Sequence, residues 1–404
     1  MIKNLLIGLL LIPNLVFAAD YWVDEGGDGS DNTACTGCPC ATAYDEIVTV
    51  ASGNDLDPGD TVHVCGGEYT SQVNVGTNDV GTAALPVTWQ CEVGETCTVN
   101  VTDAMQWRVQ DLVGQVIDGF TFTGESTNNY KIRVVRSIDI TIKNSSFSGG
   151  TGDAGVILDQ QDTTANERVT IDNNSFNSNA NCITVNFATY NVVTDTADLR
   201  NTTVIDNIAT CAGQFIGTVY GSVTTSLAAN HTASGWYIAG NEVDGTDGAG
   251  INTYFYNEGS LTNYIGWNDL RNIGDGTSNV NAYNVHYARD LVVEHNVCDT
   301  VDGDTSDSSC YILDYGDTNH TYVSDGVIIR YNVAKNCNDQ NYSSGFLAWS
   351  GKNSTFHNNY SYNCSVGYRN SNTESTGNVF YENTAVHSFK SDNSTGNSMR
   401  ISDP

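Results

Sequence analysis

The stretch VVEHNVC (residues 292–298) contains the pattern that decides the fold: an apolar anchor, Val293, followed three residues later by Asn296. Six other stretches repeat this relation. Their anchors are Ile171, Ile238, Ile265, Ile329, Phe356 and Phe380, and their asparagines are Asn174, Asn241, Asn268, Asn332, Asn359 and Asn383. Two earlier copies, anchored at Ile142 and Ile205, carry Ser145 and Ile208 in place of the asparagine.

The spacing of the anchors predicts a solenoid. Successive anchors are separated by 24 residues (Phe356 to Phe380) to 36 residues (Val293 to Ile329). The segments between them are short, β-branched and alternating, and Gly, Asn, Asp and Ser separate them, which is typical of strands. A single coil cannot bury its apolar face, whereas stacked coils can. Parallel strands then lie about 4.8 Å apart, so the asparagines are predicted to bond from coil to coil.

The N-terminal part of the chain carries a resemblance to a known family. The stretches that carry it are YWVDEGGDGSDN (21–32), PCATAYDEIVTVA (39–51), LDPGDTVHVCGGEYTSQVNV (56–75) and PVTWQ (86–90). They resemble the beginning of right-handed parallel β-helix proteins of the pectate-lyase-like class, and the resemblance covers nearly the whole mature chain. It implies an all-β, right-handed parallel β-helix solenoid of about eleven or twelve coils. It also implies a short N-terminal capping helix over residues 39–51, with Ala41, Tyr44, Ile47 and Ala51 as its apolar stripe.

The ends of the chain set the expected domain organisation. Residues 1–19 have one Lys, an apolar core and small residues at Ala18 and Ala19, which is typical of a secretory signal peptide. Residues 20–100 are then the N-terminal cap and first coils, and residues 101–404 are the remaining coils of the same continuous domain. No later apolar run is long enough to span a membrane. The sequence therefore predicts a secreted protein, extracellular or periplasmic, and leaves its oligomeric state open.

Charge and cysteine content narrow the possible partners. The chain has 16 Lys and Arg against 47 Asp and Glu, which argues against nucleic acid or an anionic membrane as a partner. Such acidity suits either the binding of divalent cations or solubility alone. Twelve cysteines fit an oxidising compartment. The CTGCPC stretch (35–40) therefore predicts disulfides around the cap in preference to a zinc site.

Two cysteines occupy equivalent places in adjacent coils. Cys337 and Cys364 each lie eight residues after their anchors, Ile329 and Phe356. Stacking of the coils would bring their Cα atoms within disulfide reach. Further candidate pairs are Cys91–Cys97, Cys182–Cys211 and Cys298–Cys310.

A column of chemically unusual residues follows the asparagine turn. Ten segments align on CYILD (310–314), and their second and fourth residues are mostly apolar and predicted to point inward. The fifth residues then point outward: Arg108, Arg133, Asp159, Asn186, Thr218, Tyr254, His286, Asp314, Trp349 and Arg369. Lys131, Asn252 and Asn284 flank them. Arginines, aromatic residues and a histidine in one column of so acidic a chain indicate a functional groove, with an ordinary decorated surface as the alternative.

The resemblance implies that an extracellular polysaccharide lies along this face. Trp349 would stack on a sugar ring, and Arg133 and Arg369 would bind carboxylates. His286 or Tyr254 would remove the proton α to a carboxylate, as a general base must. The predicted reaction is lyase β-elimination of a uronate polymer, with Asp314 orienting His286. The remaining predicted substrate contacts are Arg108, Lys131, Asp159, Asn186, Asn252 and Asn284.

Two other functions compete with the lyase. A glycoside hydrolase needs two carboxylates about 5–10 Å apart, whereas Asp159 and Asp314 are five coils apart, about 24 Å. INTYF (251–255) also stands where a polygalacturonase would need its aspartate pair. The other competitor is a non-catalytic, glycan-binding or surface-structural β-helix.

Ca²⁺, a hard cation that prefers oxygen ligands, is the one cofactor that the sequence suggests. DGTDG (244–248) and DGDTSDSS (302–309) are candidate Ca²⁺ loops, with solvated loops as the alternative. The sequence assigns no metal ligands.

Overall fold

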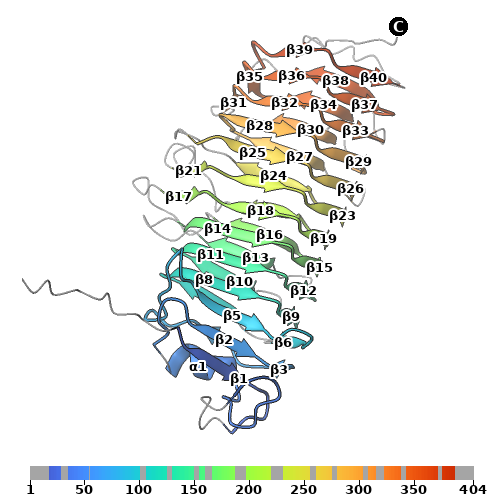
Figure 1. The fold of residues 1–404 in the computed structure, drawn as a ribbon. Coiled ribbons are helices and arrows are strands. Elements are labelled where there is room, and N and C mark those ends of the chain that lie inside the picture. The colour runs from blue at the N-terminus through green and yellow to red at the C-terminus, as the bar shows by residue number, and fades with distance from the viewer. Residues whose placement is uncertain are drawn as a thin grey trace, which may run out of the picture.

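The computed structural model shows parallel β-sheets wound into one solenoid (Figure 1). It describes residues 18–28, 35–53, 55–100, 106–124, 130–149, 154–159, 166–186, 197–219, 231–254, 261–274, 280–303, 308–314, 323–337, 343–371 and 375–386. Most of the predicted signal peptide lies outside the described residues, as do residues 304–307 of one candidate Ca²⁺ loop. No helix in these ranges is long and apolar enough to cross a membrane.

Three long sheets make up the coils. Sheet A runs β1 (Asp20–Val23), β2 (Thr61–Val64), β5 (Val87–Cys91), β8 (Val113–Asp118), β11 (Ile138–Lys143), β14 (Asn166–Asp172), β18 (Thr203–Ile205), β22 (Tyr237–Ala239), β25 (Asn263–Gly266), β28 (Leu291–Glu294), β32 (Ile328–Arg330), β36 (Thr355–His357) and β39 (Val379–Tyr381), with β17 (Ala197–Arg200) and β21 (His231–Ser234) beside this path. Sheet B runs β3 (Gly67–Tyr69), β6 (Cys97–Asn100), β9 (Thr121–Thr123), β12 (Ser146–Ser148), β15 (Ser175–Asn179), β19 (Ile208–Cys211), β23 (Glu242–Thr246), β26 (Asp269–Ile273), β29 (Val297–Val301), β33 (Val333–Lys335), β37 (Tyr360–Tyr362) and β40 (Thr384–Val386). Sheet C runs β4 (Val73–Asn74), β7 (Trp107–Gln110), β10 (Tyr130–Val135), β13 (Ala154–Asp159), β16 (Asn181–Asn186), β20 (Ile216–Val219), β24 (Ile251–Tyr254), β27 (Asn281–His286), β30 (Ser309–Asp314), β34 (Ser344–Ala348) and β38 (Val366–Asn370). A separate pair, β31 (Ser324–Asp325) and β35 (Gly351–Lys352), lies between sheets C and A in the chain.

The path of the chain is that of a right-handed parallel β-helix, as predicted. Every strand is hydrogen-bonded in parallel to the equivalent strand of the next coil within the described residues. The coils follow one another from β1 near the N-terminus to β40 near the C-terminus (Figure 1). Each complete coil has at least one strand in each of the three long sheets, and the sequence identified those in sheets A and C. The strands of sheet B directly after the asparagine turn were missed because several have only three residues, too few to show an alternation.

The predicted asparagine ladder is confirmed. It contains eight members: Asn174, Asn207, Asn241, Asn268, Asn296, Asn332, Asn359 and Asn383. At each step the backbone N–H and the side-chain amide both donate to the carbonyl of the next asparagine. Asn268, for example, donates to Asn296 Oδ1 from its backbone N (3.0 Å) and from Nδ2 (2.9 Å). The ladder satisfies buried backbone groups at the turn, where no strand partner is available.

One member of the ladder corrects the sequence analysis. Val204, not Ile205, pairs with the anchors of the neighbouring coils, Ile171 and Ile238. The asparagine three residues after Val204 is Asn207, so this coil has the same anchor-to-asparagine spacing as the others. Two apolar residues in series made the anchor ambiguous, and only the strand register resolves which one faces the core.

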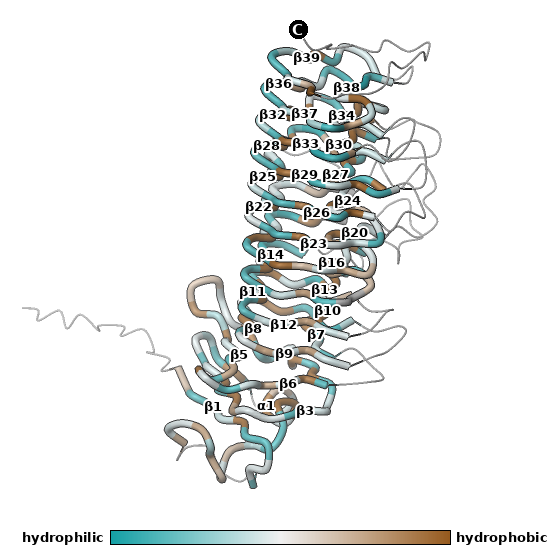
Figure 2. The backbone as a smooth tube through the Cα atoms, turned by 90° about the vertical axis from the view of Figure 1, so that its right-hand side faces the viewer, coloured by the Kyte–Doolittle hydropathy of each residue, from teal (hydrophilic) through white to brown (hydrophobic). Residues whose placement is uncertain are grey.

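The interior is filled by stacked apolar side chains. Hydrophobic and hydrophilic residues alternate along the coils (Figure 2), as expected where successive side chains point to opposite faces of a strand. Phe122, Phe147 and Phe176 stack with ring centroids 5.0 and 4.8 Å apart. Tyr283 and Tyr311 stack in the same way at 4.6 Å. Core residues of successive coils thus pack on one another as continuous ladders.

The N-terminal cap is present but shorter than predicted. Helix α1 spans Ile47–Gly53 and buries Ile47, Val50 and Ala51. Ala41 is exposed, and Tyr44 forms a parallel bridge with Val23 instead of belonging to the helix. The predicted start at residue 39 is wrong because a disulfide and this bridge hold residues 38–44 as turns and extended chain. The helix closes one end of the core, which would otherwise expose strand edges.

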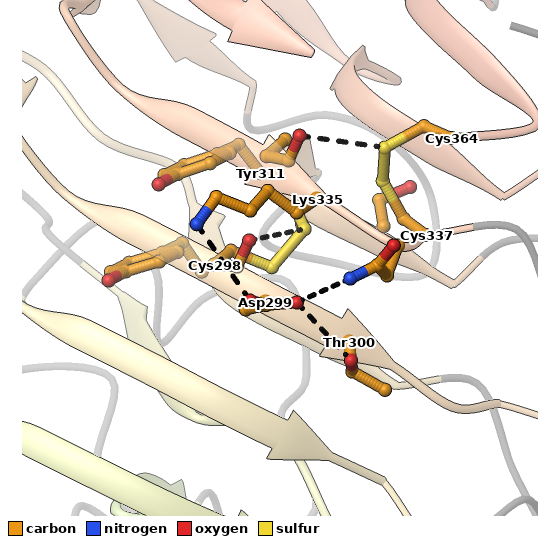
Figure 3. The surroundings of a disulfide bond; sticks show 12 residues. Cys298, Asp299, Thr300, Tyr311, Lys335, Cys337 and Cys364 are labelled. Atoms are coloured by element: carbon orange, nitrogen blue, oxygen red, sulfur yellow. Dashed lines mark hydrogen bonds and ion pairs between the residues drawn. A yellow bond between two sulfur atoms is a disulfide. The ribbon is translucent and has the colours of Figure 1, made fainter. Parts of the chain in front are cut away.

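Six disulfides use all twelve cysteines, as is typical of proteins that mature in an oxidising compartment. They are Cys35–Cys40, Cys38–Cys65, Cys91–Cys97, Cys182–Cys211, Cys298–Cys310 and Cys337–Cys364. The four pairs named from the sequence are thereby confirmed. Figure 3 shows the last two: Cys298–Cys310 lies within one coil, whereas Cys337–Cys364 joins two successive coils.

The Cys337–Cys364 link gives a direct test of the coil register. Proteolysis of the unreduced mature protein, followed by mass spectrometry, should yield one peptide pair joined through these two cysteines. Reduction before digestion should release the pair. A free thiol at either position, or a partner other than the one expected, would show that the coils are stacked differently here.

Candidate functional site

The predicted site lies on the outer face of sheet C, where the register decides which side chains meet. His286 pairs with Asp314 across β27 and β30, and Tyr254 pairs with His286 across β24 and β27. Trp349 follows β34 directly, and its backbone N–H donates to Leu313 O (3.0 Å), beside Asp314. The predicted order of neighbours from Tyr254 to Trp349 is confirmed.

The remainder of the predicted column is wrong in register at three places. The observed partners are Arg133 with Ile157, Asn186 with Val219 and Arg369 with Leu347, where the prediction had Asp159, Thr218 and Trp349. Loops of different length enter sheet C in each coil, so an alignment of short segments can slip by a residue or two. A two-residue slip keeps a side chain on the outer face, whereas the one-residue slip places Thr218 beside the inward-facing Val185.

In the N-terminal half of this outer face of sheet C, charged and polar side chains bind one another. Arg133 donates from Nε to Asp159 Oδ2 (2.8 Å), and Asn186 donates from Nδ2 to Asp159 Oδ1 (3.1 Å). The Asp159 side chain is only 1% exposed. Buried carboxylates are stable when such partners compensate them. Asp159 therefore acts first as the internal partner of Arg133, although the sequence suggested it as a substrate contact.

Two further basic residues in this half also have partners within the chain. Lys131 is buried, and its ammonium donates to Thr123 O (3.2 Å) and Gly124 O (2.7 Å). Arg108 pairs in register with Arg133 and donates to the side chain of Gln110. Both basic residues thus form hydrogen bonds with neighbouring backbone or side-chain groups of the chain.

A second group lies toward the C-terminus and is called here the His–Asp–Trp–Arg cluster: His286, Asp314, Trp349 and Arg369. His286 Nδ1 is 3.9 Å from Asp314 Oδ2, an ion-pair distance that is longer than a hydrogen bond. Their side chains are 10% and 19% exposed. The guanidinium of Arg369 lies 5.7 Å from the ring centre of Trp349, which is a cation–π contact. A base, a carboxylate, an aromatic ring and a cation thus meet across four strands. Tyr254 lies beside His286 by its backbone, and its side chain is outside the described residues.

Two predicted asparagines adjoin this cluster. Asn252 pairs with Asn284, two residues before His286 and on the same outer face. The side-chain carbonyl oxygens of both are buried and accept no hydrogen bond from the described part of the chain. Leaving a buried acceptor unpaired costs about 1–3 kcal/mol. Hydroxyl groups of a ligand could supply the missing donors.

An apolar strip beside the cluster was not predicted from the sequence. Asn284 pairs with Ile312, Ile312 with Leu347, and Leu347 with Arg369. Ile312 and Leu347 are 4% and 0% exposed, although they point to the outer face. The signal was present in the sequence, since the third residues of CYILD and GFLAW are apolar where most other copies are polar. At these exposures the chain itself covers the strip, which therefore supports the cluster by packing and not by contact with a ligand.

No metal centre is visible in the described ranges. No group of three or more His, Cys, Asp or Glu side chains lies there in a position to hold an ion. In the first candidate Ca²⁺ loop, Asp244 Oδ1 instead accepts a hydrogen bond from Asn272 Nδ2 (2.6 Å).

Comparison with known proteins supports the fold. No family model and no curated protein matches the sequence. Among solved structures, a GH136 lacto-N-biosidase from Eubacterium ramulus superposes with a TM-score of 0.53 at 13% identity, covering 92% of this chain and 68% of that one. The surface protein and adhesin PfbA of Streptococcus pneumoniae gives 0.50 at 12% identity, covering 84% and 93%. Pectate lyase Pel9A gives 0.46 at 13% identity, covering 89% and 79%. At these identities the likeness to the first two structures establishes a common fold and leaves function to the site itself.

Proposed function

We propose that this is a secreted polysaccharide-acting protein, and that the outer face of sheet C cleaves a uronate-containing polymer by β-elimination. The observation that carries the proposal is the His286–Asp314 pair, in register on adjacent strands beside Trp349 and Arg369. The six disulfides and the predicted leader support export.

Each member of the cluster has a role in this proposal. Arg369 binds the uronate carboxylate and thereby acidifies the adjacent C–H group. His286 removes that proton, the C–H electron pair becomes the new carbon–carbon double bond, and the glycosidic oxygen leaves with its own bonding pair and takes up a proton. The Asp314 carboxylate stabilises the imidazolium that forms. Trp349 supports the ring of the sugar, and Tyr254 is the alternative base.

The corrected register changes which arginine is assigned to the substrate. Arg133 lies five strands of sheet C from His286, about 24 Å away, and is paired with Asp159. Arg369 is therefore the carboxylate-binding group at the reacting sugar, and Arg133 could contact only a distant part of a long polymer.

One observation favours a second candidate, a glycan-binding protein without catalysis. The His286 side chain is only 10% exposed, and its Nδ1 is 3.9 Å from Asp314 Oδ2. In that case the unpaired Asn252 and Asn284 carbonyls and the Trp349 ring would hold the glycan without bond cleavage.

Incubation of the mature protein with a panel of uronate polysaccharides, with Ca²⁺ or with a chelator, separates these candidates. The expected result is an unsaturated product, detected by its ultraviolet absorbance. New reducing ends without unsaturation would identify a hydrolase, and retention of polymer without any product would identify a binding protein. Either result would contradict the lyase. The chelator arm measures whether the reaction requires Ca²⁺.

A further inference from the structure

A second surface, at the corner between sheets A and B, combines exposed aromatic rings with an unusual backbone. The residue before each ladder asparagine, and the one before Ser145 in an earlier coil, has a positive φ, between 51° and 69°. The column is Asn144, Asn173, Asp206, Gly240, Trp267, His295, Tyr331, Asn358 and Glu382. Asn, Asp and Gly are the residues that adopt this left-handed conformation most readily. Three successive coils instead place large rings there.

The three rings, of Trp267, His295 and Tyr331, are not expected to stabilise the folded state. A left-handed conformation costs a bulky side chain roughly 1–2 kcal/mol more than it costs Gly or Asn, and an aromatic stack returns about 0.5–1.5 kcal/mol. Trp267 is 61% exposed and Tyr331 45% exposed, so neither contributes much buried area. Strained residues that persist in the absence of a stability gain are often functional.

The Trp267 ring is held rigidly in place. It stacks on His295 with centroids 4.2 Å apart and planes 10° apart, and His295 stacks on Tyr331 at 5.2 Å. A ring fixed in this way loses little conformational entropy when it binds a ligand.

The other face of Trp267 has no ring partner among the described residues. The preceding coil has Gly240 at this position, so the ladder lacks one side chain directly beside Trp267. The Asp206 carboxylate borders the gap, because its Oδ1 lies 2.2 Å from the place where a Gly240 Cβ would be. Tyr237, 45% exposed and in the same coil as Gly240, stacks on Tyr264 beside the gap. Coils are about 4.8 Å apart, so one flat ring continues the stack on Trp267 once the flexible Asp206 side chain turns aside.

We propose that this gap, called here the Trp267 slot, binds one uncharged pyranose unit of a neutral glycan. The apolar face of the sugar packs on the free face of Trp267, in the place of the missing side chain. Its hydroxyls donate to the Asp206 carboxylate at the ring edge. The slot lies away from sheet C, so it would act as a separate anchoring site and does not depend on the proposed lyase activity.

The charges around the slot exclude acidic sugars. Asp206 is exposed, and Asp172 in the preceding coil has its pKa raised by burial and by Asp206, so the two carboxylates repel each other. A uronate in the slot would lie beside the exposed Asp206 carboxylate and would be repelled by it. A neutral sugar satisfies the same acceptors without this repulsion. The slot therefore selects a different class of sugar from the one proposed for sheet C.

Native affinity electrophoresis of the full mature protein tests the slot. Gels would contain a neutral glucan, galactan or mannan, a uronate polymer, or no polymer. Trp267→Asn removes the platform, and Gly240→Asn fills the gap with a residue that tolerates a positive φ and asks only the flexible Asp206 side chain to move. Tyr331→Asn is the matched control, since it makes the same change two coils away without touching the free face.

At least one neutral polymer is expected to retard the wild-type protein and the Tyr331→Asn variant. Trp267→Asn and Gly240→Asn should bind about tenfold more weakly, and Trp267→Asn should unfold at the same or a higher temperature. Four results would overturn the proposal: no retardation by any neutral polymer, retardation by the uronate polymer alone, equal binding by all variants, or a lowered unfolding temperature for Trp267→Asn. Quenching of Trp267 fluorescence by tetramethylammonium without sugar binding would identify a cation site instead. Loss of lyase activity would leave every one of these results unchanged, so the two proposals fail separately.

Discussion

The His286→Ala variant is expected to lose about 10²–10⁴-fold in turnover of the polysaccharide that the wild-type protein cleaves, the range typical of a lost general base. The loss should appear in kcat more than in KM, because Arg369 and Trp349 would still hold the sugar. Asp314→Asn should cost less, since it removes only the charge that stabilises the imidazolium. Initial rates of unsaturated product formation measure both effects.

The stability of both variants has to be measured together with their activity, because the side chains of His286 and Asp314 are largely buried. The sequence had suggested that His286 and Asp314 face solvent, whereas they are 10% and 19% exposed. Circular dichroism melts of both variants should show that they remain folded at the assay temperature. His63→Ala, at the opposite end of the solenoid in β2, is the matched control and should keep full activity. Full activity of the His286→Ala variant would remove the pair from the mechanism.

The second large effect is expected at the asparagine ladder. Asn268→Ala should lower the free energy of unfolding by about 3–5 kcal/mol, because several buried groups lose their partners at once. Asn268 accepts from Asn241 N (3.1 Å) and Nδ2 (2.8 Å), and donates to Ile238 O (3.1 Å) and Gly266 O (3.1 Å). Chemical denaturation followed by circular dichroism gives the change in midpoint.

Two further variants serve as comparisons for the loss of stability expected from Asn268→Ala. Asn268→Ser should cost less than Asn268→Ala, since Ser145 occupies the same place in an earlier coil and still accepts from the Phe120 N–H (3.3 Å). Asn78→Ala removes only an exposed hydrogen bond to Asp55 (3.0 Å) and should change stability by less than about 0.5 kcal/mol. Equal effects of Asn268→Ala and Asn78→Ala would mean that the ladder does not stabilise the solenoid.

The repeat was enough to predict the solenoid, its asparagine ladder and the Cys337–Cys364 link. These features depend on residues at a constant distance from the anchor within one short turn, such as Asn296 after Val293. Such a short spacing within one coil does not depend on the lengths of the loops between coils. The pairing of His286 with Asp314 was predictable for the same reason, because the two segments are equivalent over their whole length.

Other features depended on where strands of different coils come to lie, and these only the tertiary structure decided. Arg133 faces Ile157 in register and binds Asp159 diagonally, because the loop between the two strands sets a two-residue offset that no local pattern reveals. The Trp267 slot is a similar case: Gly240 and Trp267 are ordinary residues of separate coils in the sequence. They form one site because stacking places the missing side chain of one coil against the free ring face of the next.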